Sequence, residues 1–378
     1  MNTTIDPGPL VIYLANREGQ PQHESQTHRH IAERLTRLLG GQFHGDWPED
    51  PEQAEALLRE PRRRYLVPSD TLVGLDHAGA LGVLHEDDLF GAVAPHPFLP
   101  TKAISHPLPH DNAEAPLGWS DAFGQRIRGA VIEGITVFSV VDGRLAGEQL
   151  LRDGPIRLKP VLARGGLGQQ VIRDVDQLRL ALETLDCGAL ARCGLVLERQ
   201  LEDVRTFSVG QVRVGDLCLS YVGEQQLTRD NQGREVYGGS RLQLVRGDYP
   251  ALLDLPLEPA LRQALQQARD FDAAAFACFP GLIASRRNYD VAVGRDPQGR
   301  LCTGVLEQSW RIGGASTAEL VALERFAADP DLQQLQAESV EFYGEPRLLP
   351  PEAELFYRGE DPEAGLLTKY ARVIDAGQ

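Results

Sequence analysis

The sequence contains few of the residues that build covalent or metal-held frameworks. It has five cysteines among 378 residues, and none of them is spaced as CxxC. This spacing favours neither a zinc knuckle nor a disulfide framework. A Ser/His/Asp or Cys/His pattern of nucleophilic catalysis is also lacking, so we do not expect a hydrolase of that kind.

Basic residues and long apolar runs are also scarce. Lys and Arg number 38 against 54 Asp and Glu, which gives a formal net charge of -16. Nonspecific nucleic-acid binding needs surface Lys and Arg, so we expect no nucleic-acid partner. The apolar run at residues 10–15 is too short for a signal peptide or a membrane span, and we expect no membrane contact and a cytoplasmic location.

The hydrophobic content of 42% is enough for a full core, and the length suggests two or three lobes. A short apolar run followed by an amphipathic stretch at residues 24–39 predicts strand, loop and helix, and hence a small open α/β lobe. The segment at residues 94–116 is rich in proline and histidine and indicates a boundary. We therefore predict lobes at residues 1–115, 116–195 and 196–378.

A glycine-rich loop at residues 156–172 is the first segment that indicates chemistry. A strand carrying Lys159 is followed by Gly165, Gly166 and Gly168 and then by a second strand. Glycines let backbone amides turn toward an anion, and the lysine supplies a point charge for phosphate. The loop is not a P-loop or a dinucleotide fingerprint. The alternative is a hairpin turn with an incidental lysine.

The next segment, residues 195–227, is predicted to be an apolar strand that ends at Glu198, a polar break, and two antiparallel strands. A strand that ends in a polar break can offer backbone groups to an adenine, and a nearby carboxylate can accept hydrogen bonds from ribose hydroxyls. The alternative is an ordinary acidic hairpin.

A third segment places two carboxylates on paired strands. Asp290 and Glu307 are 307 − 290 = 17 residues apart, on either side of a Pro-Gln-Gly turn. Two oxygen ligands facing one site are what Mg²⁺ needs when it also bridges nucleotide phosphates. Arg311 follows and could hold an anionic group bidentately. The alternative is an antiparallel hairpin that happens to carry one acid on each strand.

Together, in this order, the Lys-Pro, the glycine-rich loop, the acidic break and the Asp…Glu pair with trailing Arg and Gly-Gly resemble the ATP-grasp superfamily. The resemblance covers residues 156–316. It is closest to the branch of ribosomal protein S6 modification enzymes and bacterial glutathione synthetases, through the Asp-x-Arg of Asp203 to Arg205 and the Arg-x-Asn of Arg229 to Asn231. It implies an α/β (α+β) fold, with a small N-terminal open α/β lobe followed by two ATP-binding subdomains with antiparallel sheets.

The resemblance also implies the roles of individual residues. Arg205 and Arg311 would be catalytic, at the phosphoryl group or the substrate carboxylate. Asp290, Glu307 and Ser309 would bind metal, although Ser309 stands where the family usually has asparagine, a better ligand. The residues implied for ATP are Lys159, Arg164, Gly165, Gly166, Gly168, Gln169, Glu198, Arg199, Leu201, Asp203, Arg229, Asp230 and Asn231.

The family's upstream phosphate lysine has no clear counterpart in the sequence. Lys102 is the nearest lysine but lies in the proline-rich stretch, and Arg126 and Arg128 are better placed. The isolated histidines of that stretch, among them His106, are not expected to bind metal.

The function implied by the resemblance is that of an ATP-dependent carboxylate-amine ligase. Its cofactors would be ATP and Mg²⁺, and its substrates a small-molecule or peptide carboxylate and an amine. By analogy we expect a homodimer. The alternatives are a nucleotide-binding protein without turnover, serving as a sensor or partner subunit, and a small-molecule kinase on the same fold.

Overall fold

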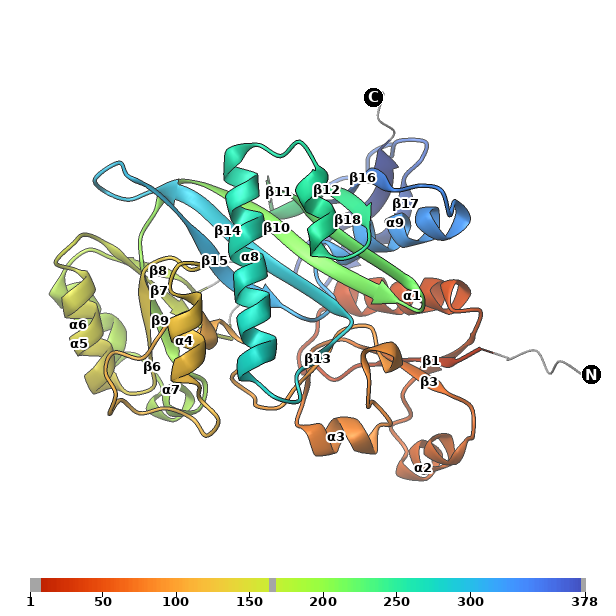
Figure 1. Cartoon of the computed structure of the whole chain (residues 1–378), viewed down its shortest axis with the longest axis horizontal. Helices are drawn as coiled ribbons and strands as arrows, with labels where there is room; N and C mark the ends of the chain where they lie inside the picture. The colour runs from red at the N-terminus through yellow and green to blue at the C-terminus, as the bar shows by residue number, and fades with distance from the viewer. Residues whose placement is uncertain (1–7, 163–167, 375–378) are drawn as a thin grey trace, which may run out of the picture.

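The computed structural model describes residues 8–162 and 168–374. These residues form an N-terminal region, a small antiparallel sheet and a large antiparallel sheet. In Figure 1 the small sheet lies at the left end, and the large sheet extends from the centre to the right, above the N-terminal region.

The N-terminal region is built on a parallel sheet with strand order β2-β1-β3. Val11 and Ile12 of β1 point to opposite faces and are both fully buried, because helices and sheets cover both faces. The elements are β1 (Leu10–Leu14), α1 (Gln22–Leu38), β2 (Gln42–Asp46), α2 (Pro51–Arg59), β3 (Arg64–Pro68), α3 (Leu75–Ala80) and the short helix η1 (Glu86–Asp88). The predicted α/β lobe is confirmed.

A second small sheet ties this region to the later chain. Its strand order is β13-β5-β4, with β4 (Leu72–Val73), β5 (Ala92–Ala94) and β13 (Ile283–Ala284). The proline-rich segment follows β5, and between residues 95 and 116, all of which are described, it contains only the short helix η2 (Lys102–Ser105).

The small antiparallel sheet has strand order β6-β9-β7-β8. Its strands are β6 (Gly134–Val137), β7 (Ile156–Pro160), β8 (Gln170–Ile172) and β9 (Leu195–Arg199), and its helices are α5 (Val140–Leu150), α6 (Val175–Glu183) and α7 (Cys187–Cys193). The helix α4 (Asp121–Ile127) precedes it. The predicted boundary at residue 195 falls inside β9, and the division into lobes remains a prediction.

The large sheet has eight strands in the order β15-β14-β10-β11-β12-β16-β18-β17. They are β10 (Glu202–Val214), β11 (Leu217–Arg229), β12 (Glu235–Arg246), β14 (Arg286–Arg295), β15 (Leu301–Ser309), β16 (Gln334–Tyr343), β17 (Glu354–Asp361) and β18 (Gly365–Ile374). The helices of this region are η3 (Tyr249–Asp254), α8 (Pro259–Cys278) and α9 (Ser316–Ala328). Together with the N-terminal lobe, the two antiparallel sheets confirm the predicted architecture.

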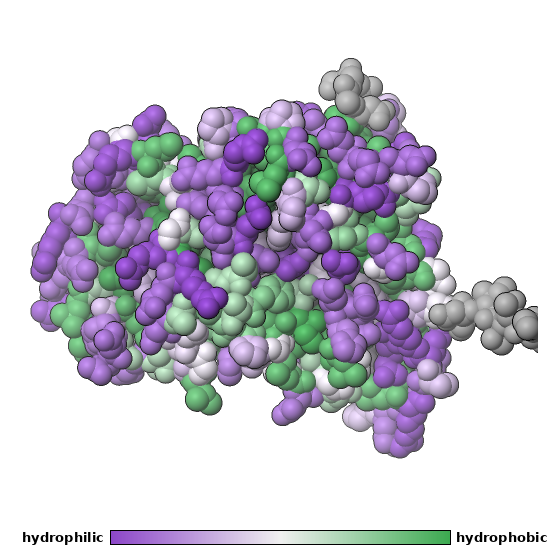
Figure 2. Space-filling view, viewed as in Figure 1, coloured by the Kyte–Doolittle hydropathy of each residue, from purple (hydrophilic) through white to green (hydrophobic). Residues whose placement is uncertain are grey.

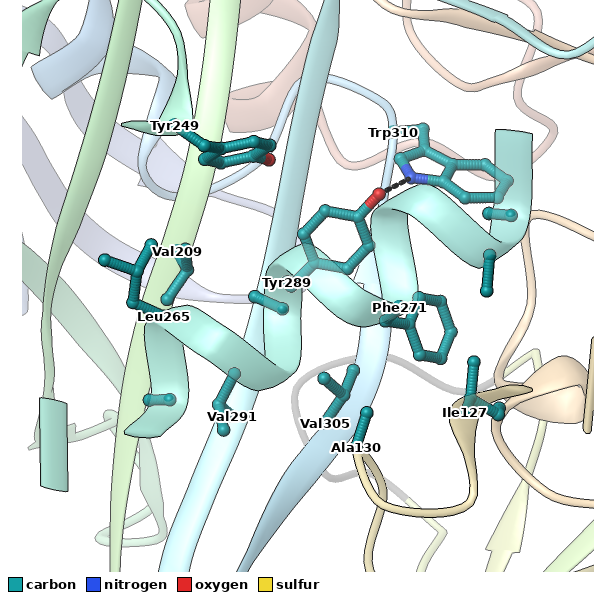
Figure 3. Packing of buried hydrophobic residues seen from close by; sticks show 14 of the residues in the cluster. Ile127, Ala130, Val209, Tyr249, Leu265, Phe271, Tyr289, Val291, Val305 and Trp310 are labelled. Carbon is teal, nitrogen blue, oxygen red and sulfur yellow. Dashed lines mark hydrogen bonds between the residues drawn. The ribbon is translucent and has the colours of Figure 1, made fainter. Parts of the chain in front are cut away.

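The helix α8 covers one face of the large sheet (Figure 1). Leu265 and Phe271 of α8 pack against Val209, Tyr289 and other buried side chains of the sheet (Figure 3). Because successive side chains of a strand point to opposite faces, Thr206 and Ser208, which alternate with Phe207 and Val209, lie on the other face. That second face forms the floor of the candidate site.

The surface of the viewed face is mostly hydrophilic, with hydrophobic residues in small patches (Figure 2). Within residues 8–162 and 168–374, none of the helices has the length and apolar character needed to cross a bilayer.

Candidate functional site

A large cavity lies where the three regions meet. It has a volume of about 1510 Å³ and is lined by the small sheet, by one face of the large sheet and by the start of α1. Pockets for one small ligand typically measure about 300–1,000 Å³, so this cavity has room for more than one.

At the small-sheet end of the cavity, the buried carboxylate of Glu198 contacts the side chains of Lys159 and His106. Lys159 Nζ lies 2.5 Å from Glu198 Oε1, and His106 Nε2 lies 3.0 Å from Glu198 Oε2. Burial would raise the pKa of Glu198, but the charge of Lys159 and the hydrogen bond from His106 lower it to about 2. Glu198 is therefore ionised, and it fixes Lys159 at the cavity wall.

Asp290 and Glu307 face each other on the paired strands β14 and β15, as the sequence predicted. Asp290 Oδ1 accepts hydrogen bonds from Gln225 Nε2 and Asn288 Nδ2, each at 2.8 Å. Burial and then the charge of Glu307 raise the pKa of Asp290 to about 6. Because the two carboxylates repel each other when both are ionised, a divalent cation bound between them would be stabilised.

Lys102, to which the sequence gave no role, lies at the cavity. Lys102 is buried, with its Nζ 2.7 Å from Glu307 Oε2. Gln308 Nε2 donates to the carbonyl of Thr101 at 2.7 Å and so fixes the segment that carries Lys102. Arg126 and Arg128 are exposed and do not line the cavity. The proline-rich sequence gave no local sign of this placement, because the contact joins residues 205 positions apart.

A buried ion pair shapes the loop after β15. Arg286 Nε and Nη2 lie 3.0 and 2.7 Å from the two carboxylate oxygens of Glu319, and both side chains are almost fully buried. Arg286 Nη1 also donates to the carbonyls of Ser309, at 3.0 Å, and of Arg311. Sequence reasoning missed this pair. It holds in place the backbone from which Arg311 projects.

Arg311 and Ser309 both line the cavity next to Glu307. The Arg311 side chain is 23% exposed, and its Nε lies 4.0 Å from Asp70 Oδ1 of the N-terminal region. Ser309 is paired in the sheet with Asn288. The amide of Asn288 therefore lies on the strand next to Ser309, the position at which the resemblance leads us to expect asparagine.

Several predicted nucleotide residues also lie at the cavity. Gln169, Glu198, Arg199 and Leu201 line it near Lys159, and the guanidinium of Arg199 is paired with Glu133. Gly168 has a φ of +69° and follows the loop, but it does not line the cavity. Arg164, Gly165 and Gly166 lie outside the described residues.

The structure does not bring Arg205 to the cavity. Arg205 lies on the α8 face of the sheet, half-exposed, with its Nε 2.8 Å from Glu224 Oε1 and its Nη2 2.8 Å from Glu258 Oε1. Asp203, with a φ of +51°, and Arg229 are exposed and also do not line the cavity. The pairing of β10 with β14 is irregular between Glu202 and Arg205, which changes the face to which the following side chains point.

Asp230 and Asn231 line the cavity, but their side chains hold hairpins together. Asp230 accepts hydrogen bonds from the backbone N–H groups of Gln232 and Arg234, at 2.9 Å each. Asn231 Nδ2 donates to the carbonyls of Ala364 and Leu366, at 2.6 and 3.0 Å. These contacts join the β11–β12 hairpin to the β17–β18 turn and narrow that side of the cavity.

Among the described residues, no cluster of three or more His, Cys, Asp or Glu side chains forms a metal site. The pair Asp290 and Glu307 therefore offers two protein carboxylates, and any further oxygen ligands would come from a bound molecule, from water or from neutral side chains such as Ser309.

The comparisons with known proteins agree with this architecture. A family model described as "Protein of unknown function (DUF3182)" matches residues 11–371. A search of curated proteins found no match. Among solved structures, N5-carboxyaminoimidazole synthetase from Staphylococcus aureus complexed with ADP is 12% identical, with a TM-score of 0.58 over 98% of this chain and 94% of that chain.

A second solved structure is the biotin carboxylase domain dimer of the Hydrogenobacter thermophilus 2-oxoglutarate carboxylase, in complex with MgADP, ADP and bicarbonate. It is 14% identical, with a TM-score of 0.55 over 96% of this chain and 86% of that chain. At these identities the likeness concerns the fold alone. That fold is the ATP-grasp fold, as the sequence predicted, whereas the S6 modification and glutathione synthetase branch remains a prediction.

Proposed function

Because the chain belongs to the DUF3182 family and has the ATP-grasp fold, we propose that it is an ATP-dependent ligase that activates a carboxylate and joins it to an amine. The observation that carries this proposal is the paired Asp290 and Glu307, with Lys102 and Lys159 in the same cavity. This set of charges suits a polyphosphate with a divalent cation.

Asp290 and Glu307 fit Mg²⁺ by their chemistry. Both offer carboxylate oxygens, and the raised pKa of Asp290, which has burial and then Glu307 as its main causes, indicates that the pair lacks sufficient positive charge. Asp290 and Glu307 would hold the ion, and Ser309 is a third candidate. When bound, Mg²⁺ would supply charge neutralisation at the phosphates.

The two lysines would bind the phosphates of ATP. Lys159 is fixed by Glu198, and Lys102 by Glu307 and by the segment that Gln308 holds. Glu198 and Leu201 at the end of β9 would face the base. These groups are oriented before any ligand binds, so little reorganisation would be needed when charge develops in the reaction.

The reaction would have two steps. A carboxylate oxygen of the substrate would attack the γ-phosphorus, and the bond to the leaving ADP would break. The neutral amine nitrogen would then form the C–N bond while the acyl C–O bond breaks, and the departing phosphate would take the electron pair and the proton that the nitrogen loses. Arg311 would hold the anionic carboxylate or phosphoryl group at the loop that Arg286 braces. A homodimer and a cytoplasmic location stay predictions.

The test combines ADP release with chemical trapping. The protein is incubated with MgATP and a panel of carboxylic acids in the presence of hydroxylamine, which converts an acyl phosphate into a stable hydroxamate. Acid-dependent ADP release with hydroxamate formation is the expected result. ADP release with a stable phosphorylated product and no hydroxamate would instead indicate a kinase.

A second candidate function is nucleotide binding without turnover, which is favoured by Ser309 in place of the usual asparagine. In that case the protein would bind a nonhydrolysable ATP analogue in calorimetry but release no ADP with any acid of the panel.

A further inference from the structure

The part of the cavity that is lined by the start of α1 and by β16 and β18 is built from groups to which sequence reasoning gave no role. There, the start of α1 lies against β17 and Asp361 at its end, and β18 joins β17 to β16 in the large sheet. The residues that line this part of the cavity include Arg17, His23, Glu24, Glu341 and Lys369.

Two ion pairs lie in this wall. Lys369 Nζ lies 3.0 Å from Glu341 Oε2 across the paired strands β16 and β18, and the two side chains are only 11% and 14% exposed. Arg17 Nη1 contacts Glu24 Oε2, with side chains 21% and 26% exposed. Each pair therefore presents one cationic and one anionic group in the same part of the cavity.

The other ionisable groups that line this part of the cavity are neutral, held by backbone donors or exposed to water; Asp361 is anionic, because burial is outweighed by hydrogen bonds from three backbone N–H groups, which lower its pKa. Burial, and next the charge of Lys369, lower the pKa of His23 to about 4, so the imidazole is neutral at neutral pH. Asp361 accepts hydrogen bonds from the backbone N–H groups of His23, Glu363 and Ala364, at 2.9 Å each. Glu360 and Glu363 are exposed, where water and salt screen them.

Each of the two ion pairs has a net charge of zero, and this restricts the charge that a bound ligand can carry. A purely anionic or purely cationic guest would leave one partner of a half-buried pair uncompensated, which is costly in a poorly solvated site. A guest that carries one carboxylate and one ammonium group can pair with both signs and leave none uncompensated. Its own net charge is also zero.

We propose that this part of the cavity is the amine-substrate subsite and that it binds a small zwitterion, an amino acid, with its carboxylate at Lys369 or Arg17 and its ammonium at Glu341 or Glu24. The proposal rests on the proposed ligase function, because it assigns the amine of that reaction. The nucleotide groups Lys159, Asp290 and Glu307 are on other elements, so binding at the two places can be measured separately.

The test is equilibrium binding, by calorimetry and ligand-observed NMR, of the twenty common L-amino acids, β-alanine and 4-aminobutanoate to the full chain. Each compound that binds is compared with its methyl ester, which lacks the carboxylate charge, and with its N-acetyl derivative, which lacks the ammonium. We expect at least one zwitterion to bind, and both derivatives to bind at least tenfold more weakly.

The variants Lys369→Met and Glu341→Gln should each weaken binding of that zwitterion at least tenfold. A matched control is the pair Arg372 and Glu338, which joins the same two strands with a contact of 2.7 Å but does not line the cavity. Arg372→Met should leave zwitterion binding unchanged. Affinity for a nonhydrolysable ATP analogue should be retained in all three variants, which also shows that they fold.

Two results would overturn the proposal while leaving the ligase function intact: nucleotide binds but no zwitterion of the panel does, or Arg372→Met lowers zwitterion affinity as much as Lys369→Met. If zwitterions bind as expected but no nucleotide binds, the subsite is supported as a zwitterion site, and it is the ligase function that fails.

Discussion

The carboxylate of Asp361 accepts a hydrogen bond at 2.9 Å from the backbone N–H of His23, 338 residues earlier in the chain. His23 lies in the first turn of α1, and the residue before this helix, Pro21, provides no side-chain cap. Asp361 therefore caps α1 from the turn between β17 and β18. The same turn accepts the side chain of Asn231 from the β11–β12 hairpin.

Replacing Asp361 with Asn should lower the free energy of unfolding by about 1 kcal/mol, because its hydrogen bonds with backbone N–H groups would no longer be charge-assisted and would be about half as strong. Denaturant unfolding measures this change. The exposed Asp331 provides a control, since Asp331→Asn is expected to be neutral within about 0.5 kcal/mol. Equal effects of the two substitutions would mean that the cap does not stabilise the protein.

Asp290→Asn combined with Glu307→Gln should abolish the Mg²⁺ dependence of nucleotide binding and leave the fold intact, because the pair would no longer offer anionic oxygens. Calorimetric titration with a nonhydrolysable ATP analogue, with and without Mg²⁺, measures this. A Mg²⁺ dependence equal to that of the unchanged protein would refute the metal assignment.

Lys102→Met and Lys159→Met should each weaken binding of the ATP analogue at least tenfold, which corresponds to about 1.4 kcal/mol. Arg205→Met is the matched control, since Arg205 lies on the α8 face of the sheet and its loss should leave the affinity unchanged. Loss of affinity in Arg205→Met would restore the role that the sequence suggested for it.

Lys159→Met should also destabilise the fold, because it leaves the buried Glu198 without its main compensating charge. Adding Glu198→Gln should recover part of the stability but not the nucleotide affinity. Thermal unfolding and calorimetry on the single and double variants separate these two effects.

The low pKa of Glu198 predicts a pH dependence of stability. Because Lys159 and His106 outweigh burial and hold the pKa near 2 in the folded protein, against an ordinary value of 4.5, the ionised form stabilises the fold. This contribution is complete above about pH 4.5 and is lost as pH falls toward 2. The Glu198→Gln variant should be less stable at pH 7 but should lose less stability between pH 4.5 and 2, as measured by denaturant unfolding.

Local patterns predicted the elements that carry the site. The amphipathic stretch at residues 24–39 is α1, residues 22–38, and the Pro-Gly turn between Asp290 and Glu307 set their register because the hairpin is local. The exact pairing of the two acids also depends on an irregularity between Asp290 and Val291, which the alternation of side chains did not predict.

Contacts between distant segments could not be predicted in this way. Lys102 contacts Glu307, and His106 contacts Glu198, across long stretches of sequence, and neither residue of each pair has a local sequence signature. The role of Arg205 came from the resemblance of the Asp-x-Arg motif, which does not specify the face of the strand; in the structure Arg205 lies on the α8 face, next to Glu258.

The cap on α1 also has a consequence for the order in which the molecule can be completed. A ribosome makes α1 among the first 40 residues, but Asp361 and Lys369 emerge more than 300 residues later. Until then the start of α1 has no carboxylate cap, and the part of the cavity beside α1 lacks the residues of β17 and β18 that line it. The newly made chain can form its N-terminal sheet early, but this part of the cavity is finished only with the last two strands.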